Sequence, residues 1–425
     1  MNQNLADANE KVYLDYNATT FLEPEVLQAI HNALDTAWGN PSSSYKAGRD
    51  AKDIINSARK NVAEMIGCQS SEDIIFTSGG TEANNMVFHT ALKYFKEVYP
   101  LFENGTTQYS DVGSKCKAHV ITSNLEHDSV KLPIEHFVKE GIMDATYVPA
   151  SKLTGMVNAD DIIAAIRPTT CLISVMMANN ETGIIQPISE ISKRVKLVKR
   201  DGKFEVRRIL LHTDAAQAIG KIPVNVEDLG VDYLTIVGHK FYGPRIGALY
   251  VREPIKTTPV HPMLFGGGQE RNLRPGTENT GMIAGLGKAA ELVVKHLSSY
   301  QTHMREIRDY LETSLENAFR GRIHFNGRFT ESQRIPNTCN VSIEGPGLQG
   351  YKILEAVKHF VASVGAACHS DHRCEPSHIL IAIGTPWDVA SNALRLSTGR
   401  HTTKRNIDLV IQDLKQAVAI LEGKI

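Results

Sequence analysis

Short apolar segments alternate with helical segments over most of this chain. The apolar segments are rich in β-branched residues, which is typical of strands buried on both faces of a sheet. We expect seven strands before residue 252, at Ile74–Thr77, Val120–Ser123, Thr146–Val148, Leu172–Met177, Ile209–His212, Tyr233–Val237 and Ala248–Val251. Helical periodicity between them, as in Ala83–Phe95 and Ile188–Lys199, predicts an α/β fold with a mostly parallel, doubly wound sheet.

Two helices are expected before the first strand. One opens at Pro24, a first-turn position that suits proline, and the other covers Ala47–Ile66 and ends at Gly67. After Gly266 the pattern changes to a glycine-rich loop and then to a long helical region, Met282–Leu315. We therefore place a domain boundary between that loop and that helix.

This boundary divides the chain into three parts. Residues 1–22 are expected to form an N-terminal segment that packs with a small C-terminal domain, residues 23–281 a large domain with the seven-stranded sheet, and residues 282–425 the small domain. The small domain is predicted to be α+β, with elements at Cys339–Ile343, Leu348–Lys358, Val361–Val364, Leu394–Ser397 and Asn406–Leu421. The polar, aperiodic segment Tyr99–Lys117 is predicted to be a mobile loop remote from the chemistry.

Composition limits the class of protein. With 425 residues, 42% of them hydrophobic, and a formal net charge of -1, the chain can bury a large core and has no basic excess for nucleic acid or anionic lipid. No apolar run approaches the ~18 residues of a membrane span, and the first residues are polar and acidic, unlike a signal peptide. The six cysteines show no disulfide-framework spacing. We expect a soluble, cytosolic protein with no nucleic-acid or membrane partner.

The segment Asp232–Val251 carries the first candidate for chemistry. Lys240 follows its apolar strand and precedes a turn at Gly243 and Pro244. A lysine at the end of a buried strand can be partly desolvated beside a pocket, with a lowered pKa, and can then form a Schiff base. Taken alone, the pattern more often indicates a surface lysine after an edge strand.

Polar residues also stand at the ends of other predicted strands. At Phe76–Asn85, small residues lead into a helix whose first amide groups, with the Thr81 hydroxyl, could bind a phosphate or simply cap the helix. Asp214 ends another strand, with Gln217 just beyond it. A carboxylate there could keep a pyridinium nitrogen protonated, or it could cap a helix.

His127, Asn179 and Asn180 follow two further strands. His127 could stack on an aromatic cofactor or be a structural histidine, and the asparagines could be turn residues. All of these groups fall at successive strand ends of one sheet, where ligands bind in α/β folds. We therefore expect them to converge on one crevice.

Motifs along nearly the whole chain resemble those of the class V, fold-type I pyridoxal-phosphate enzymes of the cysteine desulfurase and selenocysteine lyase family. The motifs are LDYNATT, GNPSS, TSGGTEANN, EH, NNETG, HTDAAQ, GHKFYGP, GGGQERNLRPGTEN, ACHS and LRLSTGR. The resemblance implies that the large domain binds pyridoxal 5'-phosphate (PLP) and that the small domain carries a catalytic cysteine loop. It also implies a homodimer with active sites at the interface.

The resemblance implies a role for each candidate residue. Lys240 would form the Schiff base, Asp214 would contact the pyridine nitrogen and Gln217 the ring hydroxyl. His127 would stack on the ring and take part in catalysis. The phosphate would be held by Gly80, Thr81 and His239, with Thr277 reaching in from the second subunit, and the substrate carboxylate by Arg395 and by Asn180, which would also contact the cofactor.

One position departs from the family pattern. Many desulfurases have a serine two residues before the histidine that precedes the lysine, where this chain has Val237. One phosphate-binding hydroxyl is therefore missing, and the cradle is expected to rely more on Thr81, His239 and backbone amides.

Residues 363–378 contain the cysteine that the resemblance implies to be catalytic, Cys368. In the family it lies on a mobile loop and takes the chalcogen from the substrate or acts beside it. Cys368, His369, His372 and Cys374 could instead bind a metal, but their spacing fits no common zinc pattern. We expect no metal.

The resemblance leaves two activities, selenocysteine lyase and cysteine desulfurase, and favours the lyase. Desulfurases usually have a basic residue after the stacking histidine and serine or threonine after the loop cysteine, where this chain has Asp128 and His369. A selenol is already ionised without a nearby base, unlike a thiol with a pKa of about 8.5. We hypothesise that Asp128 helps to exclude the sulfur substrate, and we expect a selenium-acceptor protein as a further partner. A non-catalytic relative of the family is disfavoured, because the residues implied to carry the chemistry are all present, namely Lys240, Asp214, His127 and Arg395.

Overall fold

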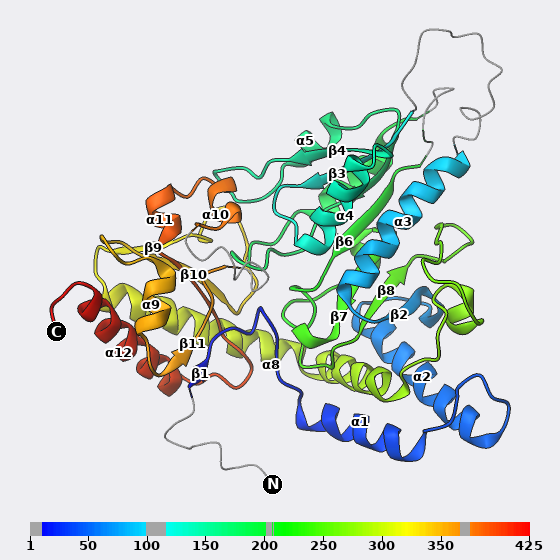
Figure 1. Cartoon of the computed structure of the whole chain (residues 1–425), viewed down its shortest axis with the longest axis horizontal. Coiled ribbons are helices and arrows are strands. Elements are labelled where there is room, and N and C mark those ends of the chain that lie inside the picture. The colour runs from blue at the N-terminus through cyan, green and yellow to red at the C-terminus, as the bar shows by residue number, and fades with distance from the viewer. Residues whose placement is uncertain (1–10, 99–115, 201–205, 207, 366–374) are drawn as a thin grey trace, which may run out of the picture.

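A computed structural model describes residues 11–98, 116–200, 206, 208–365 and 375–425 of the chain (Figure 1). Most of the segment predicted to be a mobile loop, residues 99–115, lies outside the described residues. So does the part of the cysteine loop from 366 to 374.

A seven-stranded sheet forms the centre of the larger part of the molecule. Its strand order is β2-β8-β7-β6-β5-β3-β4. Six strands run parallel, and β8 is antiparallel to both of its neighbours. The predicted mostly parallel sheet is therefore confirmed, with strands at β2 (Ile74–Thr77), β3 (Ala118–Ser123), β4 (Met143–Val148), β5 (Thr170–Ser174), β6 (Leu210–Asp214), β7 (Tyr233–Val237) and β8 (Gly247–Val251).

Strand β5 ends three residues before the predicted Met177. The backbone amides of Val175 and Met177 still donate to carbonyls of β6, at His212 and Asp214, but outside the regular ladder. The apolar run therefore continues past the strand as hydrogen-bonded extended chain.

Helices cover both faces of this sheet. Alternate strand residues face opposite cores: Ile75 packs with α3 (Gly80–Val98) and α4 (Asp128–Lys139), whereas Ile74 and Phe76 pack on the other side. That second core also takes residues from α1 (Pro24–Thr36), α2 (Lys46–Met65), α5 (Ala159–Ala164), α6 (Ile188–Leu197), α7 (Val226–Leu229) and α8 (Thr280–Ala318). Burial on both faces explains why most positions in these strands are apolar.

The six parallel strands end at the same edge of the sheet. Thr77 at the end of β2 and Val237 at the end of β7 both pair with Gly247 of the intervening β8. The loops that follow the parallel strands therefore open side by side along one edge, which is where ligands bind in α/β sheets.

A second, smaller part is built on the antiparallel sheet β12-β10-β9. The N-terminal β1 pairs in parallel with β11, and Leu14 is buried in the core of this part. Strand β11 is shorter than the predicted Val361–Val364, because from Ser363 the backbone bonds to Arg395 instead. The elements are β1 (Val12–Tyr13), β9 (Ile323–Phe325), β10 (Thr338–Ile343), α9 (Gly350–Ala356), β11 (Phe360–Val361), α10 (His378–Ala382), α11 (Trp387–Ser391), β12 (Ala393–Ser397) and α12 (Lys404–Leu421).

Helix α8 joins the two parts without a break (Figure 1). Ile283 and Leu286 near its start belong to the core beneath the large sheet, whereas Ile307 and Leu311 belong to the core of the smaller part. The division at residue 282 stays a prediction, because one helix serves both cores. Among the residues that the structure describes, no helix combines the length and apolar character that a membrane span requires.

Candidate active site

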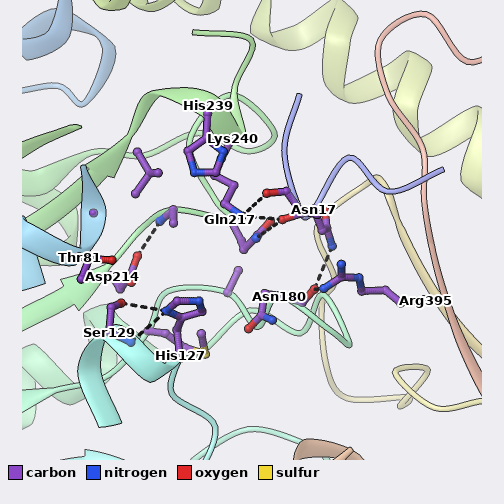
Figure 2. A pocket seen from close by; sticks show the side chains of 16 residues that line it. Asn17, Thr81, His127, Ser129, Asn180, Asp214, Gln217, His239, Lys240 and Arg395 are labelled. Atoms are coloured by element: carbon purple, nitrogen blue, oxygen red, sulfur yellow. Dashed lines mark hydrogen bonds between the residues drawn. The ribbon is translucent and has the colours of Figure 1, made fainter. Parts of the chain in front are cut away.

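A pocket of about 230 Å³ opens at the carboxyl edge of the large sheet, where it meets the N-terminal segment and the smaller part (Figure 2). Most of the residues predicted from the sequence to bind a cofactor or substrate lie around it. Its lining consists of Asn17, Ala18, Gly80, Thr81, His127, Ser129, Met176, Ala178, Asn180, Asp214, Ala216, Gln217, Val237, His239, Lys240 and Arg395.

Lys240 lies on the pocket wall, in the single helical turn η3 (Gly238–Lys240) that follows β7. Its Nζ donates to the backbone carbonyls of Asn17 at 2.8 Å and Ala18 at 2.7 Å. Both acceptors belong to the N-terminal segment, so that segment orients the lysine from across the pocket. Lys240 therefore lies on the wall of a pocket and is not a surface lysine after an edge strand.

One end of the pocket is suited to a phosphate. Gly80 and Thr81 form the first turn of α3, where backbone amides point outward and favour an anion. The His239 ring also lines the pocket, and its Nδ1 contacts Thr19 Oγ1 at 3.0 Å. Burial and then the nearby Lys240 and Arg245 charges lower the pKa of His239 to about 4, so this ring is neutral at pH 7 and can donate one hydrogen bond.

Val237 fills the place where a serine was noted to be missing. A Cβ added to Gly80 would lie 2.5 Å from Val237 Cγ2, so residue 80 has no room for a side chain. This contact keeps the first turn of α3 against the end of β7.

Asp214 and Gln217 occupy the floor of the pocket. Asp214 accepts from the Ala216 amide at 2.9 Å through Oδ1 and from Asn84 Nδ2 at 2.9 Å through Oδ2. It therefore stabilises a turn rather than capping a helix, and it also faces the pocket. Gln217 accepts from the buried Lys221 through Oε1 at 2.6 Å, which leaves its NH₂ group as the donor.

His127 has a structural and a pocket-lining position at once. Its Nδ1 accepts from the Ser129 amide at 3.1 Å and caps the first turn of α4. Because Nδ1 is an acceptor, the proton of the neutral ring lies on Nε2.

The two asparagines after β5 have different roles. Asn179 is completely buried, and its Oδ1 accepts from the amides of Glu181 and Thr182, so it holds the turn. Asn180 lines the pocket, and its carbonyl accepts from Arg395 Nη1 at 3.3 Å.

Arg395 reaches the pocket from β12 although its side chain is only 1% exposed. Its Nη2 donates to Asp15 Oδ1 at 2.7 Å. Its Nε is buried and has no hydrogen-bond partner among the described residues. A buried guanidinium with a donor to spare suits a substrate carboxylate.

Two predicted site residues, Thr277 and Asp128, do not line this pocket, and two others lie outside the described residues. Thr277 lines a second pocket, with Arg274 and Glu278, and Asp128 lies next to His127 at the start of α4 without lining the first pocket. Cys368 and His369 lie outside the described residues, as do the other two candidate metal ligands, His372 and Cys374. Within the described ranges, no group of three His, Cys, Asp or Glu side chains is arranged to hold a metal.

Sequence reasoning missed the contribution of the N-terminal segment. Asn17 accepts from Lys240 and Gln217 through its carbonyl, and its Nδ2 donates to the Asn180 carbonyl at 3.1 Å. The LDYNATT motif was a signal for this segment, but no local pattern shows that residue 17 lies beside residue 240. Ser129, two residues after the His127 of the EH motif, was missed in the same way.

These groups fit PLP. The first turn of α3, the Thr81 hydroxyl and neutral His239 suit its phosphate, Asp214 suits its ring nitrogen, the Gln217 amide suits its hydroxyl, and Lys240 is the amine that would bind its aldehyde. The side chains line a single pocket from one side to the other (Figure 2). Fold and site together define a PLP-dependent enzyme of fold type I.

Comparisons with known proteins agree with this class. The family model for class V aminotransferases matches residues 12–99 and 104–410, and the chain belongs to that family. Selenocysteine lyase from Rattus norvegicus is 59% identical over 418 residues, 98% of this chain and 96% of the relative. Cysteine desulfurase IscS from Dictyoglomus turgidum is 40% identical over 412 residues, 96% of this chain and 94% of the relative. The solved structure of a NifS-like protein, 31% identical, superposes with a TM-score of 0.81 over 96% of this chain and 100% of that one.

Proposed function

We propose that this protein is a PLP-dependent selenocysteine lyase that converts L-selenocysteine to L-alanine and selenium for reuse. The observation that carries the proposal is the pocket in which Lys240, Asp214, His127 and Arg395 meet. The choice of selenium is supported by the selenocysteine lyase that is 59% identical, against 40% for the desulfurase.

Arg395 and Asn180 would hold the substrate carboxylate. The guanidinium is held by Asp15 and by the Asn180 carbonyl, which use two of its five N–H bonds, and its buried Nε is among the donors that remain. A bidentate arginine fixes both the position and the direction of a carboxylate. The amino acid would therefore enter with its Cα directed toward Lys240.

Lys240 would then move the proton at the substrate Cα. PLP supplies an electron sink that stabilises negative charge at that carbon. The carbonyls of Asn17 and Ala18 hold the Lys240 amine at the pocket wall, within reach of an atom in the pocket. Asp214 is fixed by Asn84 and the Ala216 amide, so its carboxylate stays in the pocket.

Cys368 would act on the selenium. In one form of this step the selenium leaves Cβ for the thiol sulfur, the Cβ takes the thiol proton to become a methyl group, and a perselenide remains on Cys368. A later reductant then releases selenide. In the other form, Cys368 only gives its proton to Cβ, the selenium leaves as elemental selenium, and the selenol proton returns to the Cys368 thiolate.

Cysteine desulfurase is the second candidate, because the 40% identical relative carries that name. One assay separates the two functions: the purified holoenzyme is incubated anaerobically with L-selenocysteine or L-cysteine, and the alanine formed is measured. A lyase forms alanine much faster from L-selenocysteine. Equal rates, or a higher rate with L-cysteine, would contradict the proposal.

The homodimer is also a proposal. Thr277 lines a pocket of its own chain that is separate from the cofactor pocket, so it would reach a PLP phosphate only across an interface. The side chains of Trp38 and Phe265 are 74% and 88% exposed, as interface residues are in a separated subunit. Light scattering should give the mass of two chains, and a fully active single chain would contradict the proposal. The selenium-acceptor protein and the cytosolic location are proposed from the sequence alone.

A further inference from the structure

A line of buried polar side chains runs beneath the pocket floor, across strands β5, β6 and β7 into helix α3. Ser174 Oγ contacts His212 Nδ1 at 2.8 Å, and His212 Nε2 contacts Thr235 Oγ1 at 3.1 Å. Thr235 Oγ1 donates to Asn84 Oδ1 at 2.6 Å. All four residues are buried, so each hydrogen bond is made in a medium where water does not compete.

Asn84 divides this line into two branches. Its Nδ2 donates to Asp214 Oδ2 at 2.9 Å and to Ser129 Oγ at 2.8 Å. The Ser129 hydroxyl lies 2.9 Å from His127 Nδ1, which also accepts from the Ser129 amide. One amide group therefore reaches both the pocket carboxylate and, through one hydroxyl, the pocket imidazole.

The chemistry of the groups fixes the direction of every hydrogen bond. A carboxylate only accepts, so the Asn84 atom beside Asp214 must be its NH₂ group, and its oxygen must face Thr235. Thr235 then donates to Asn84 and accepts from His212 Nε2, so His212 Nδ1 accepts from Ser174. Both N–H bonds of Asn84 are used, and Ser129 is left to donate to His127.

The state of His212 agrees with this direction. Burial lowers the pKa of His212 to about 4, so the ring is neutral at pH 7 and carries one proton, which the chain of bonds assigns to Nε2. His119 and its two threonine partners belong to a separate group outside this line.

We propose that Asn84 is a positioning residue that fixes the Asp214 carboxylate and, through the Ser129 hydroxyl, the position of the His127 ring. The inference rests on the proposed PLP site, because these two groups face the pyridine nitrogen and the ring face there. It follows that loss of Asn84 disturbs both contacts to the cofactor, whereas loss of Ser129 disturbs only the one from His127.

The test uses three variants of the holoenzyme. Asn84→Leu replaces the amide by an apolar group of similar size, Ser129→Ala removes only the hydroxyl to His127, and Ser174→Ala removes one buried hydrogen bond at the far end of the line. The measurements are the pH dependence of the visible absorbance of the bound cofactor, the kcat and KM for L-selenocysteine, and urea unfolding.

Asn84→Leu should shift the pH midpoint of the absorbance change by about one unit and lower kcat about 10- to 100-fold with a smaller change in KM, as expected for a lost hydrogen bond to a charged group. Ser129→Ala should lower kcat and leave the midpoint unchanged. Adding Ser129→Ala to Asn84→Leu should cost less than the product of the two separate losses, because the branch is already broken. Ser174→Ala should reduce stability alone.

A folded Asn84→Leu with the wild-type midpoint and kcat would overturn the inference, and so would a Ser174→Ala that shifts the midpoint as far. If Asn84→Leu does not fold, Asn84→Ser takes its place. It is then compared with Ser129→Ala and Ser174→Ala in the same way. A wild-type protein that binds no PLP would instead overturn the proposed function. A wild type that binds PLP, with variants that do not differ from it, would overturn only the inference.

Discussion

Asp128 is the residue that we hypothesise to bear on the choice of chalcogen. It is the first residue of α4 and follows His127, whose ring lines the pocket. A fixed negative charge there opposes the formation of a second negative charge on the substrate. A thiol substrate must lose a proton near pH 8.5 before it reacts, whereas a selenol arrives ionised. On this hypothesis, the charge of Asp128 would disfavour the sulfur substrate more than the selenium substrate.

Replacing Asp128 should therefore relax the discrimination. Asp128→Lys is expected to raise the rate of alanine formation from L-cysteine about 10-fold, because about one pKa unit of thiol ionisation is recovered. Asp128→Asn, which removes the charge and keeps the size, should fall between the wild type and the lysine variant. Circular dichroism checks folding, because a cation at the start of a helix is unfavourable. No gain on L-cysteine in a folded variant would sink the hypothesis.

At the scale of elements, the site depends on how the loop after β2 lies against β7 and β8. Gly247 of β8 pairs with both Thr77 and Val237, and a Cβ at residue 247 would lie 2.7 Å from the Gly79 carbonyl carbon. The same close approach leaves no room at Gly80 beside Val237. The first turn of α3, which would hold the phosphate, is thus positioned by contact with two strands.

Gly80→Ala should displace that turn. The added methyl group would overlap Val237 Cγ2, so we expect PLP affinity to fall about 10-fold, measured by absorbance titration. The double variant Gly80→Ala with Val237→Ala removes the overlap and should recover most of the affinity. Equal affinity in the single variant, or no recovery in the double variant, would contradict this account of the turn.

The sequence predicted site residues best where a short apolar strand ends in a polar residue. Thr81, His127, Asn180, Asp214 and Lys240 were predicted together because the parallel strands of an α/β sheet end at one edge. The contacts of Asp15 and Asn17 with Arg395 and Lys240 could not be predicted in this way. They join residues more than 200 positions apart, and no periodicity in the chain encodes such a pairing.

Nor could the sequence separate the two asparagines after β5. Asn179 and Asn180 are the same residue type in the same turn, and only the direction of each side chain decides that the first holds the turn and the second faces the pocket. The central position of Asn84 in this hydrogen-bonded line was likewise not predictable, because its partners lie on three other elements, α4, β6 and β7.

At the scale of the whole molecule, buried titratable groups tie stability to pH. Burial is the main cause that lowers the pKa of His119, His212 and His239 from 6.5 to about 4. Burial also raises the pKa of the Glu126 carboxyl from 4.5 to about 8, so this group keeps its proton in the folded protein. Glu126 accepts from the Met176 amide at 3.0 Å and holds the start of the pocket wall.

These shifts predict a stability maximum near neutral pH. As the pH falls from about 6.5 to about 4, the unfolded chain takes up protons that the three folded histidines do not bind, so the free energy of unfolding should decrease. The contribution of Glu126 is complete below about pH 4.5 and is lost as the pH rises through about 8. Urea unfolding between pH 4 and pH 9 should show both limbs.

Two variants identify which buried group causes the decrease in the free energy of unfolding on each side of neutral pH. Glu126→Gln keeps the shape without the titration and should flatten the decrease above neutral pH, while His119→Gln should make the acid limb less steep. An alkaline limb unchanged in Glu126→Gln would show that this carboxyl is not the buried neutral group described here.

The claim on which the whole account depends is that Lys240 carries PLP in the pocket at the carboxyl edge of the sheet. Borohydride reduction of the yellow holoenzyme, followed by proteolysis and mass spectrometry of the peptides, tests it most directly. The account predicts a reduced cofactor fixed to Lys240 alone, and neither the modified peptide nor turnover in Lys240→Ala. A cofactor fixed to another lysine, such as the neighbouring Lys221, or turnover retained without Lys240, would contradict it.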